Sequence, residues 1–314
     1  MKTIWQVMVV VVVVGMALGA SAQAREATGG TWTSGAAMPT GVDDGAAAVL
    51  EDEVYVVGGA STSGGNGVLA DVQIYNPATN AWSTGTSYPT IVEAASAAVV
   101  KNILYVFGGT PDGYTESNAV WAYSPKTKTW ASKTAMPTGG WNSLAVVEKN
   151  IIYVIGGYNP SDGYLSTVQS YDPATDTWTE EASLPITDAA PAGGLIGSTI
   201  VVADGTPGPG TSTGDTEGYD AATNSWASLA TDPTARYGTC SGTIGSKLYD
   251  AGGQPAPTVN ESFQLSKNKW TTLAPMPQGT MVGASAVYKG NLYCFGGWAT
   301  WEGTPVNYVQ IYQP

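Results

Sequence analysis

The chain of 314 residues contains no histidine, and charged residues make up only 12% of it. Without histidine there can be no Ser-His-Asp triad, no imidazole general base and no histidine-ligated zinc, copper or iron. Basic residues are the scarcer sign, with 12 against 25 acids and a net charge of −13. Such an acidic chain has no electrostatic attraction for nucleic acid or for an anionic membrane. The sequence therefore predicts neither a nucleic-acid-binding protein nor a histidine-dependent enzyme.

The first 24 residues have the features of a secretory signal peptide (1–24). Lys2 provides a positive charge, Val7–Ala20 is an apolar run, and small residues precede Arg25. The alternative, a membrane anchor, needs roughly 20 apolar residues, so we expect export with cleavage before Arg25, or less favourably before Gln23. We therefore expect a secreted or periplasmic protein without stable membrane insertion.

The mature chain, residues 25–314, is one unit repeated six times. A tryptophan marks each copy at intervals of 44–50 residues: Trp32, Trp82, Trp130, Trp178, Trp226 and Trp270. A proline follows each tryptophan by seven residues: Pro39, Pro89, Pro137, Pro185, Pro233 and Pro277. Five copies carry a glycine pair and the fourth has Asp-Gly: Gly58-Gly59, Gly108-Gly109, Gly156-Gly157, Asp204-Gly205, Gly252-Gly253 and Gly296-Gly297. A period of this length with strand-like content indicates propeller blades rather than helical arrays.

Each copy is expected to form four short strands. In the first copy these are Ala46–Leu50, Val54–Val57, Val72–Tyr75 and Ala81–Thr84, separated by charged or proline-containing turns. No segment sustains a helical period, so we expect almost no helix. The repeated tryptophans and tyrosines are assigned to packing between blades.

The two ends of the chain complete each other. The sixth copy stops after its third strand, at Val309–Tyr312, whereas the chain begins with a spare fourth strand around Trp32. Pairing them removes both sheet edges. We therefore predict an all-β, six-bladed propeller whose ring is closed by the N-terminal strand (30–39), with repeats at about 40–90, 91–138, 139–187, 188–234, 235–279 and 280–314.

The repeat resembles the kelch repeat. The matching residues in the first copy are Val54-Tyr55-Val56-Val57-Gly58-Gly59, Val72-Gln73-Ile74-Tyr75-Asn76-Pro77, Trp82 and Tyr88-Pro89. This resemblance covers about residues 30–314 and implies a kelch β-propeller. Kelch propellers include binding domains, sialic acid epimerases, galactose oxidase and specifier proteins. The absence of histidine excludes the copper site of galactose oxidase and the iron site of the specifier proteins.

The resemblance also implies two faces of opposite character. Loops after the proline and after the glycine pair share one face, where family members bind partners, and tight turns form the other. Eight of nine mature lysines fall on the turns, whereas the loops carry acids and Arg236 as their one basic residue. This pattern fits a solubilising rim, or a site for cationic groups, neutral polyols or carboxylate-bound Ca²⁺.

Aromatic residues outside the repeat pattern lie on the same loops. They either pack the loops down or present flat faces to a ligand. Our candidate ligand-contacting residues are Asp43, Asp44, Glu93, Trp141, Tyr158, Asp188, Arg236, Tyr237, Trp298 and Trp301. Arg236 and Trp141 are the first choices, because their loops enter the innermost strands beside the central channel.

The sequence favours a non-catalytic, exported and monomeric binding module for a glycan or a peptide or protein ligand, without cofactor or metal. The alternative is a sugar epimerase or lyase, similar to the sialic acid epimerases, that uses carboxylates of the loop face with Arg236. Cys240 and Cys294 are expected near the loop-face end of adjacent blades, where they form either a disulfide or two buried core residues.

Overall fold

The computed structural model describes residues 29–62, 67–300 and 303–314. The predicted signal peptide (1–24) and Trp301 lie outside the described residues. Within the described part, no helix is long and apolar enough to cross a bilayer.

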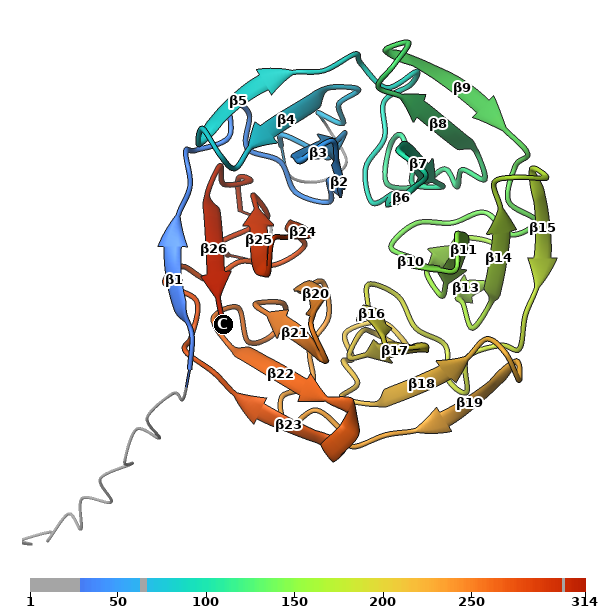
Figure 1. The fold of residues 1–314 in the computed structure, drawn as a ribbon, viewed down its shortest axis with the longest axis vertical. Helices are drawn as coiled ribbons and strands as arrows, with labels where there is room; N and C mark the ends of the chain where they lie inside the picture. The colour runs from blue at the N-terminus through green and yellow to red at the C-terminus, as the bar shows by residue number, and fades with distance from the viewer. Residues whose placement is uncertain (1–28, 63–66, 301–302) are drawn as a thin grey trace, which may run out of the picture.

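Six four-stranded antiparallel sheets surround a central axis as the blades of a propeller (Figure 1). Blade one consists of β2 (Ala46–Leu50), β3 (Glu53–Val57), β4 (Val72–Asn76) and β5 (Ala81–Thr84). Blade two consists of β6 (Ser96–Val100), β7 (Ile103–Phe107), β8 (Val120–Ser124) and β9 (Thr129–Lys133). Blade three consists of β10 (Leu144–Glu148), β11 (Ile151–Ile155), β14 (Val168–Asp172) and β15 (Thr177–Glu180).

Blade four consists of β16 (Ala192–Ile196), β17 (Thr199–Ala203), β18 (Thr216–Asp220) and β19 (Ser225–Ser228). Blade five consists of β20 (Cys240–Ile244), β21 (Lys247–Ala251), β22 (Asn260–Gln264) and β23 (Lys269–Thr272). Blade six consists of β24 (Ala284–Tyr288), β25 (Asn291–Phe295), β26 (Val309–Gln313) and β1 (Thr31–Ser34). A small hairpin, β12 (Tyr158–Asn159) with β13 (Gly163–Tyr164), belongs to a loop of the third blade. One 3-10 turn, Leu265–Lys267, is the only helical element of the described residues.

Ring closure by the N-terminal strand is confirmed. β1 pairs antiparallel with β26 at the outer edge of the sixth blade, and Trp32 lies opposite Tyr312 in the register. The two rings lie 5.0 Å apart between centroids. The predicted six-bladed, all-β fold is therefore the observed one, and the pairing covers the outer edge of β26 and completes the sixth blade with four strands.

The repeated tryptophan joins each blade to the one before it. Trp82 on β5 lies 5.0 Å from Tyr75 of its own blade and, edge-on, 5.7 Å from Phe295 of the sixth blade. Its indole N–H donates a 2.8 Å hydrogen bond to the Ala36 carbonyl, just beyond β1, and the other five tryptophans donate equivalent bonds. Only Trp270 of the six is buried, because the others keep one edge exposed on the outermost strand.

The glycine pairs connect the blades near the axis. The second glycine donates its N–H to a carbonyl in the next blade, as Gly59 does to Val92 at 2.8 Å. The first glycine has a left-handed backbone (φ +64° at Gly58), and a Cβ there would collide with the same Val92 carbonyl. Glycine is therefore required wherever the two backbones approach this closely. The fourth blade departs from this rule, because Asp204 occupies the position with φ 58°.

A closed circle of backbone hydrogen bonds surrounds the axis, and we call it the hub ring. Its members all have left-handed backbones and occupy one position of the repeat: Asp44, Ala94, Asn142, Ala190, Gly238 and Val282. Each N–H donates to the carbonyl of the equivalent residue in the preceding blade, at 2.6–3.0 Å. These residues line a cavity of about 130 Å³ at the axis. The hub ring fixes the base on which the loop face is built.

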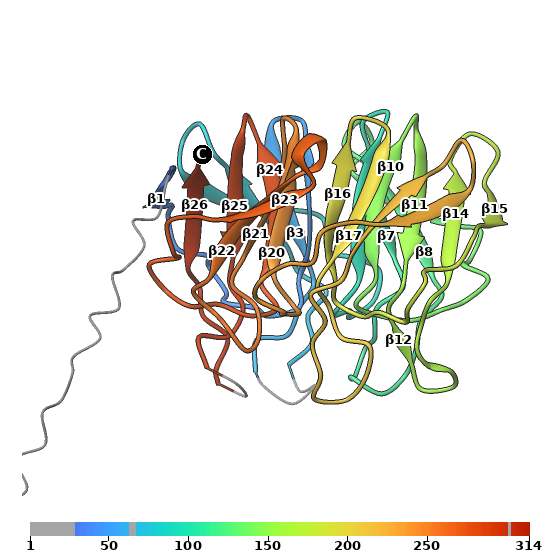
Figure 2. The same ribbon diagram turned by 90° about the horizontal axis from the view of Figure 1, so that it is seen from below.

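The two faces of the propeller differ in the length of their connections. Figure 2 shows long loops, including β12, on the lower side and short hairpin turns on the upper side. The long loops are those between the second and third strands of each blade and between successive blades. We call this side the loop face.

Candidate functional site

A cavity of about 560 Å³ lies on the loop face, over blades three to six. We call it the aromatic cavity because five aromatic side chains line it: Trp141, Tyr158, Tyr164, Tyr237 and Trp298. Its volume falls within the range of about 300–1,000 Å³ that is usual for small-molecule sites. Four residues with polar side chains, Asp44, Asn142, Thr206 and Gln254, also line it. The cavity thus combines flat apolar faces with a few hydrogen-bonding groups.

The aromatic side chains come from one repeated feature of the backbone. In every blade the residue just before the hub ring forms a short antiparallel bridge with the residue that follows the glycine pair. These bridges are Trp141–Tyr158 in blade three, Tyr237–Gln254 in blade five and Met281–Trp298 in blade six. Because all six bridges surround the hub ring, aromatic residues at these positions converge above the axis.

The hairpin of β12 and β13 adds a further aromatic side chain to the cavity. It places Tyr164 opposite Tyr158, with ring centroids 5.2 Å apart, and Tyr158 lies 5.2 Å from Trp141. Buried Asn159 fixes the hairpin, since its amide donates to the Gly139 carbonyl and its Oδ1 accepts from the Asp162 N–H at 2.7 Å. The three rings therefore form a continuous wall whose orientation is set before any ligand arrives.

Acidic residues occupy the bridge positions of the first two blades. Asp43 and Glu93 are buried there, and Asp44 of the hub ring reaches the aromatic cavity; we call the three the hub carboxylates. Burial, with the charge of Glu93, raises the pKa of Asp43 to about 7. Burial and the charges of Asp43 and Glu93 raise the pKa of Asp44 well above its ordinary value. A carboxyl with a pKa near neutrality, that of Asp43, is therefore adjacent in the chain to Asp44, which lines the cavity.

The structure brings together five of the ten residues that the sequence singled out. Asp44, Trp141, Tyr158, Tyr237 and Trp298 line the aromatic cavity, and Asp43 and Glu93 belong to the hub carboxylates. Asp188 is only 3% exposed and does not line it, because its side chain is turned towards the backbone of Gly205. Tyr164, Asn142 and Gln254 line the cavity but were not among those ten.

The expectation that Arg236 lies on the binding surface is wrong. Its side chain is 0% exposed, and its Nη2 lies 3.0–3.5 Å from carboxylate oxygens of Asp204, Asp232, Asp250 and Glu261. Residue 236 directly precedes the bridge residue of its blade, and the equivalent residues Val42 and Val92 are buried in the hydrophobic clusters between blades. We call these five residues the buried ion cluster.

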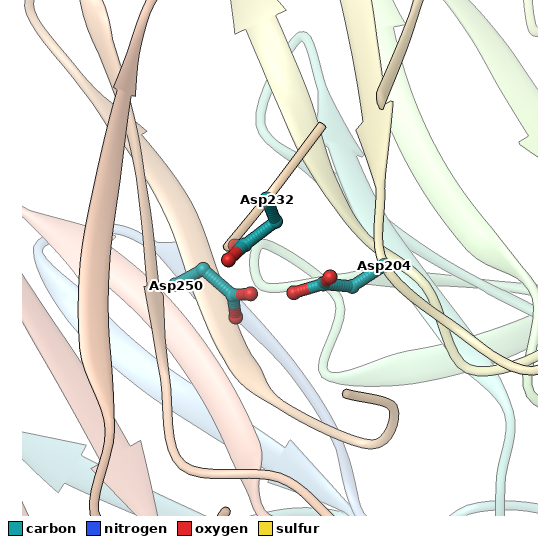
Figure 3. A group of neighbouring side chains, drawn as sticks. All are labelled: Asp204, Asp232 and Asp250. Atoms are coloured by element: carbon teal, nitrogen blue, oxygen red, sulfur yellow. The ribbon is translucent and has the colours of Figure 1, made fainter. Parts of the chain in front are cut away.

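The buried ion cluster resembles a metal site but holds a guanidinium. Figure 3 shows the carboxylates of Asp204, Asp232 and Asp250 pointing towards one another, with one oxygen from each within 4.8 Å of the others. The Arg236 Nη2 lies within 3.5 Å of each of these carboxylates. A cation is thus already supplied by the chain, and the three aspartates do not form a metal centre.

Protonation balances the remaining negative charge of the cluster. Burial, and after it the charge of the nearby Asp250, raises the pKa of Asp204 far above its ordinary value. Burial and a hydrogen bond with Glu261 raise the pKa of Asp232 to about 8. Burial alone would lower the pKa of Arg236, but the surrounding carboxylates outweigh it and raise the pKa. The guanidinium therefore stays charged while at least part of its acidic shell is neutral.

Departures from the repeat could have revealed the cluster from sequence. Asp204 replaces the first glycine of the pair, Asp232 the Met, Leu or Tyr before the proline, and Asp250 the Val or Cys after the repeated tyrosine. Each substitution puts charge at an interior position of the repeat. Since all fall at one junction between blades four and five, they predict a compensating cation, which is Arg236.

The two cysteines form a disulfide. Cys240 on β20 and Cys294 on β25 lie in adjacent blades, with Cα atoms 5.8 Å apart and the sulfurs bonded. The sequence left open a disulfide or two buried core cysteines, and the structure has the disulfide. It fixes blade five to blade six at the side of the propeller where the chain is closed.

Comparisons with known proteins agree with the architecture. The sequence profile of the KLHDC2/KLHL20/DRC7 Kelch-repeats domain matches residues 33–194, slightly more than half of the chain. The solved structure of YjhT superposes with a TM-score of 0.74 at 21% identity, covering 87% of this chain and 95% of that one. At this identity the likeness concerns the fold alone, and no curated protein sequence matches the chain. The protein belongs to the kelch-repeat family of β-propellers.

Proposed function

We propose that this propeller is a binding module that takes up a glycan in the aromatic cavity. The observation that carries the proposal is the convergence of five aromatic side chains, from blades three, five and six, on one cavity. Sugar rings present apolar faces that pack on aromatic rings, and their hydroxyls need hydrogen-bond partners such as Asp44, Asn142 and Gln254.

The arrangement of the cavity favours a glycan over a peptide. Aromatic rings form its walls, whereas the hub ring, with Asp44 and Asn142, contributes polar groups to its base. The bridges, the hub ring and the Asn159 contacts hold these groups in place, which lowers the entropy lost on binding. Among the described residues, no strand of the six blades contributes to the cavity lining, so an extended peptide in the cavity has no blade edge to join.

We also propose that the mature protein acts outside the cytoplasm. The signal-like N-terminus supports export, and the disulfide between Cys240 and Cys294 is of the kind that persists in oxidising compartments. Fractionation of cells expressing the full chain, with mass measurement of the secreted or periplasmic product, would test export. A product that keeps residues 1–24 in the cytoplasm would contradict it.

Binding to glycan and peptide arrays, followed by calorimetry on the mature chain, tests the main proposal. Trp141→Ala and Trp298→Ala should weaken glycan binding, because stacking on one aromatic ring is worth about 1–3 kcal/mol, or roughly 5- to 150-fold in affinity. Tyr114→Ala is the matched control, since Tyr114 lies on the loop face, is 78% exposed and does not line the cavity. Normal binding by both tryptophan variants, or capture of peptides alone, would overturn the proposal.

The hub carboxylates support a second candidate function, a carbohydrate isomerase, epimerase or lyase. A carboxyl with a pKa of about 7, as at Asp43, can both give and take a proton near neutral pH. Arg236 cannot contribute to such chemistry from its buried position. Turnover of sugar anomers or uronic polymers that Asp43→Asn and Asp44→Asn each abolish, and that Asp71→Asn on the same face leaves intact, would favour this enzyme over the binding module.

A further inference from the structure

We propose that the glycan taken up by the aromatic cavity carries a free, protonated amine, as amino sugars without an N-acetyl group do, and that carboxylated sugars are rejected. This inference rests on the proposed glycan-binding function and specifies its ligand. It is carried by the distribution of charge around the cavity together with the geometry of its aromatic walls.

The cavity offers a ligand no positive charge. No lysine or arginine lines it among the described residues, and Asp44 is the one carboxyl-bearing residue in the lining. Arg236, the basic residue nearest in sequence to the cavity wall, has its guanidinium held by four acids with 0% exposure. A bound carboxylate would therefore lose its hydration without gaining an ionic partner, which is costly.

A carboxyl group, which a bound cation would ionise, and aromatic faces instead line the same cavity. Asp44 lines the cavity, with Asp43 and Glu93 close enough to influence its pKa, and Trp141, Tyr237 and Trp298 line it with Asp44. A cation over an aromatic face within about 6 Å gains about 0.5–2 kcal/mol, most over tryptophan. An ammonium in the cavity can therefore contact both a carboxylate and several π faces.

The same contacts separate an amine from a neutral sugar. A neutral sugar ring can stack on Trp141 or Trp298 and hydrogen-bond to Asn142, but it offers no positive charge to a carboxylate at Asp44. An ammonium favours the ionised form of Asp44, because an opposite charge within about 4–6 Å lowers a carboxyl pKa. The amine thus adds a charge-assisted hydrogen bond to the stacking that both sugars share.

Calorimetry with three trisaccharides tests the inference: a glucosamine trimer, an N-acetylglucosamine trimer and a galacturonic acid trimer. We expect the glucosamine trimer to bind at least about tenfold more tightly than the acetylated one, which corresponds to about 1.4 kcal/mol. We expect the galacturonic acid trimer not to bind. Added salt should weaken binding of the glucosamine trimer and leave that of the acetylated trimer unchanged, because salt screens only the charged interaction.

The Asp44→Asn variant assigns the preference to one residue. Asparagine tolerates the left-handed backbone of Asp44 (φ 48°), so the hub ring should remain intact. The variant should lower glucosamine affinity to that of the acetylated trimer, whereas Asp71→Asn, which removes an exposed acid of the loop face outside the cavity, should not.

The outcomes separate the two proposals. Equal affinity for the acetylated and free amines, or tighter binding of the galacturonic acid trimer, would overturn the amine preference and leave glycan binding standing. A failure of all three sugars, and of every glycan on the array, would overturn glycan binding itself. Retention of the amine preference in Asp44→Asn would show that another group provides it and would overturn the assignment.

Discussion

Arg236→Ala should destabilise the protein strongly rather than weaken ligand binding. The substitution removes a guanidinium that lies 3.0–3.5 Å from four carboxylates and leaves these acids buried without a cation. Removing one partner of a buried ion pair costs about 3–5 kcal/mol. Urea unfolding of the mature chain, followed by tryptophan fluorescence, would measure this loss as a lower midpoint at an unchanged slope.

Replacing the whole cluster should have the opposite result. The junction between blades six and one packs the same positions with uncharged residues: Gly296, Met38, Val42, Val56 and Gln73. Installing these residue types gives a five-fold variant: Asp204→Gly, Asp232→Met, Arg236→Val, Asp250→Val and Glu261→Gln. Since the desolvation of buried ions often exceeds their attraction, this variant should be as stable as the natural chain or up to about 4 kcal/mol more stable.

Together, the two variants test whether the buried ion cluster holds blades four and five together. If Arg236→Ala cost less than about 1 kcal/mol, the cluster would not hold blades four and five together as its distances indicate. If the five-fold variant lost as much stability as Arg236→Ala, the ions would provide more than the repeat's apolar packing can replace. If Arg236→Ala kept full stability and lost ligand affinity, Arg236 would be the ligand contact that its burial excludes.

Three further predictions concern stability. The pKa of Asp232 rises from 3.8 to about 8 on folding, so the folded protein holds an extra proton between these pH values. The free energy of unfolding should therefore fall as the pH rises from about 4 to 8. Asp232→Asn should flatten this slope in pH-dependent urea unfolding, and an equally steep slope would contradict the assignment. Cys294→Ser opens a bridge between residues 54 apart, which the chain-entropy account values at about 4 kcal/mol, and reducing agent should destabilise the natural chain alone. Trp270→Ala should lower the free energy of unfolding by about 3–5 kcal/mol, because Trp270 is only 6% exposed. Trp141→Ala should leave the unfolding midpoint nearly unchanged. A clearly lower midpoint for Trp141→Ala would make Trp141 a packing residue.

The architecture could be predicted from the sequence because each repeat carries the same local signals. The tryptophan, the proline seven residues later and the glycine pair mark each blade, and the structure uses all three in contacts between blades. Closure by β1 could also be predicted from the sequence. The sixth copy lacks its fourth strand and the chain begins with a spare one, so the two pair with each other.

The candidate site could be predicted in part. Trp141, Tyr237 and Trp298 stood out because they are aromatic residues outside the repeated pattern, and their positions in the repeat place them around the hub ring. The contribution of Tyr164 depends on the β12–β13 hairpin, which is a local departure of one loop from the repeat. Such a departure has no equivalent in the other blades from which its conformation could be inferred.

Arg236 shows where the sequence alone was insufficient. Its position in a loop of the binding side predicted exposure, but the direction of a side chain is set by the blade against which it packs. Repetition determined the number of blades, their order and the closure of the ring, because those depend on local hydrogen bonding and edge pairing. Only the tertiary structure decided which charges are buried and which aromatic faces share a cavity, because both depend on contacts between blades that lie tens of residues apart in the chain.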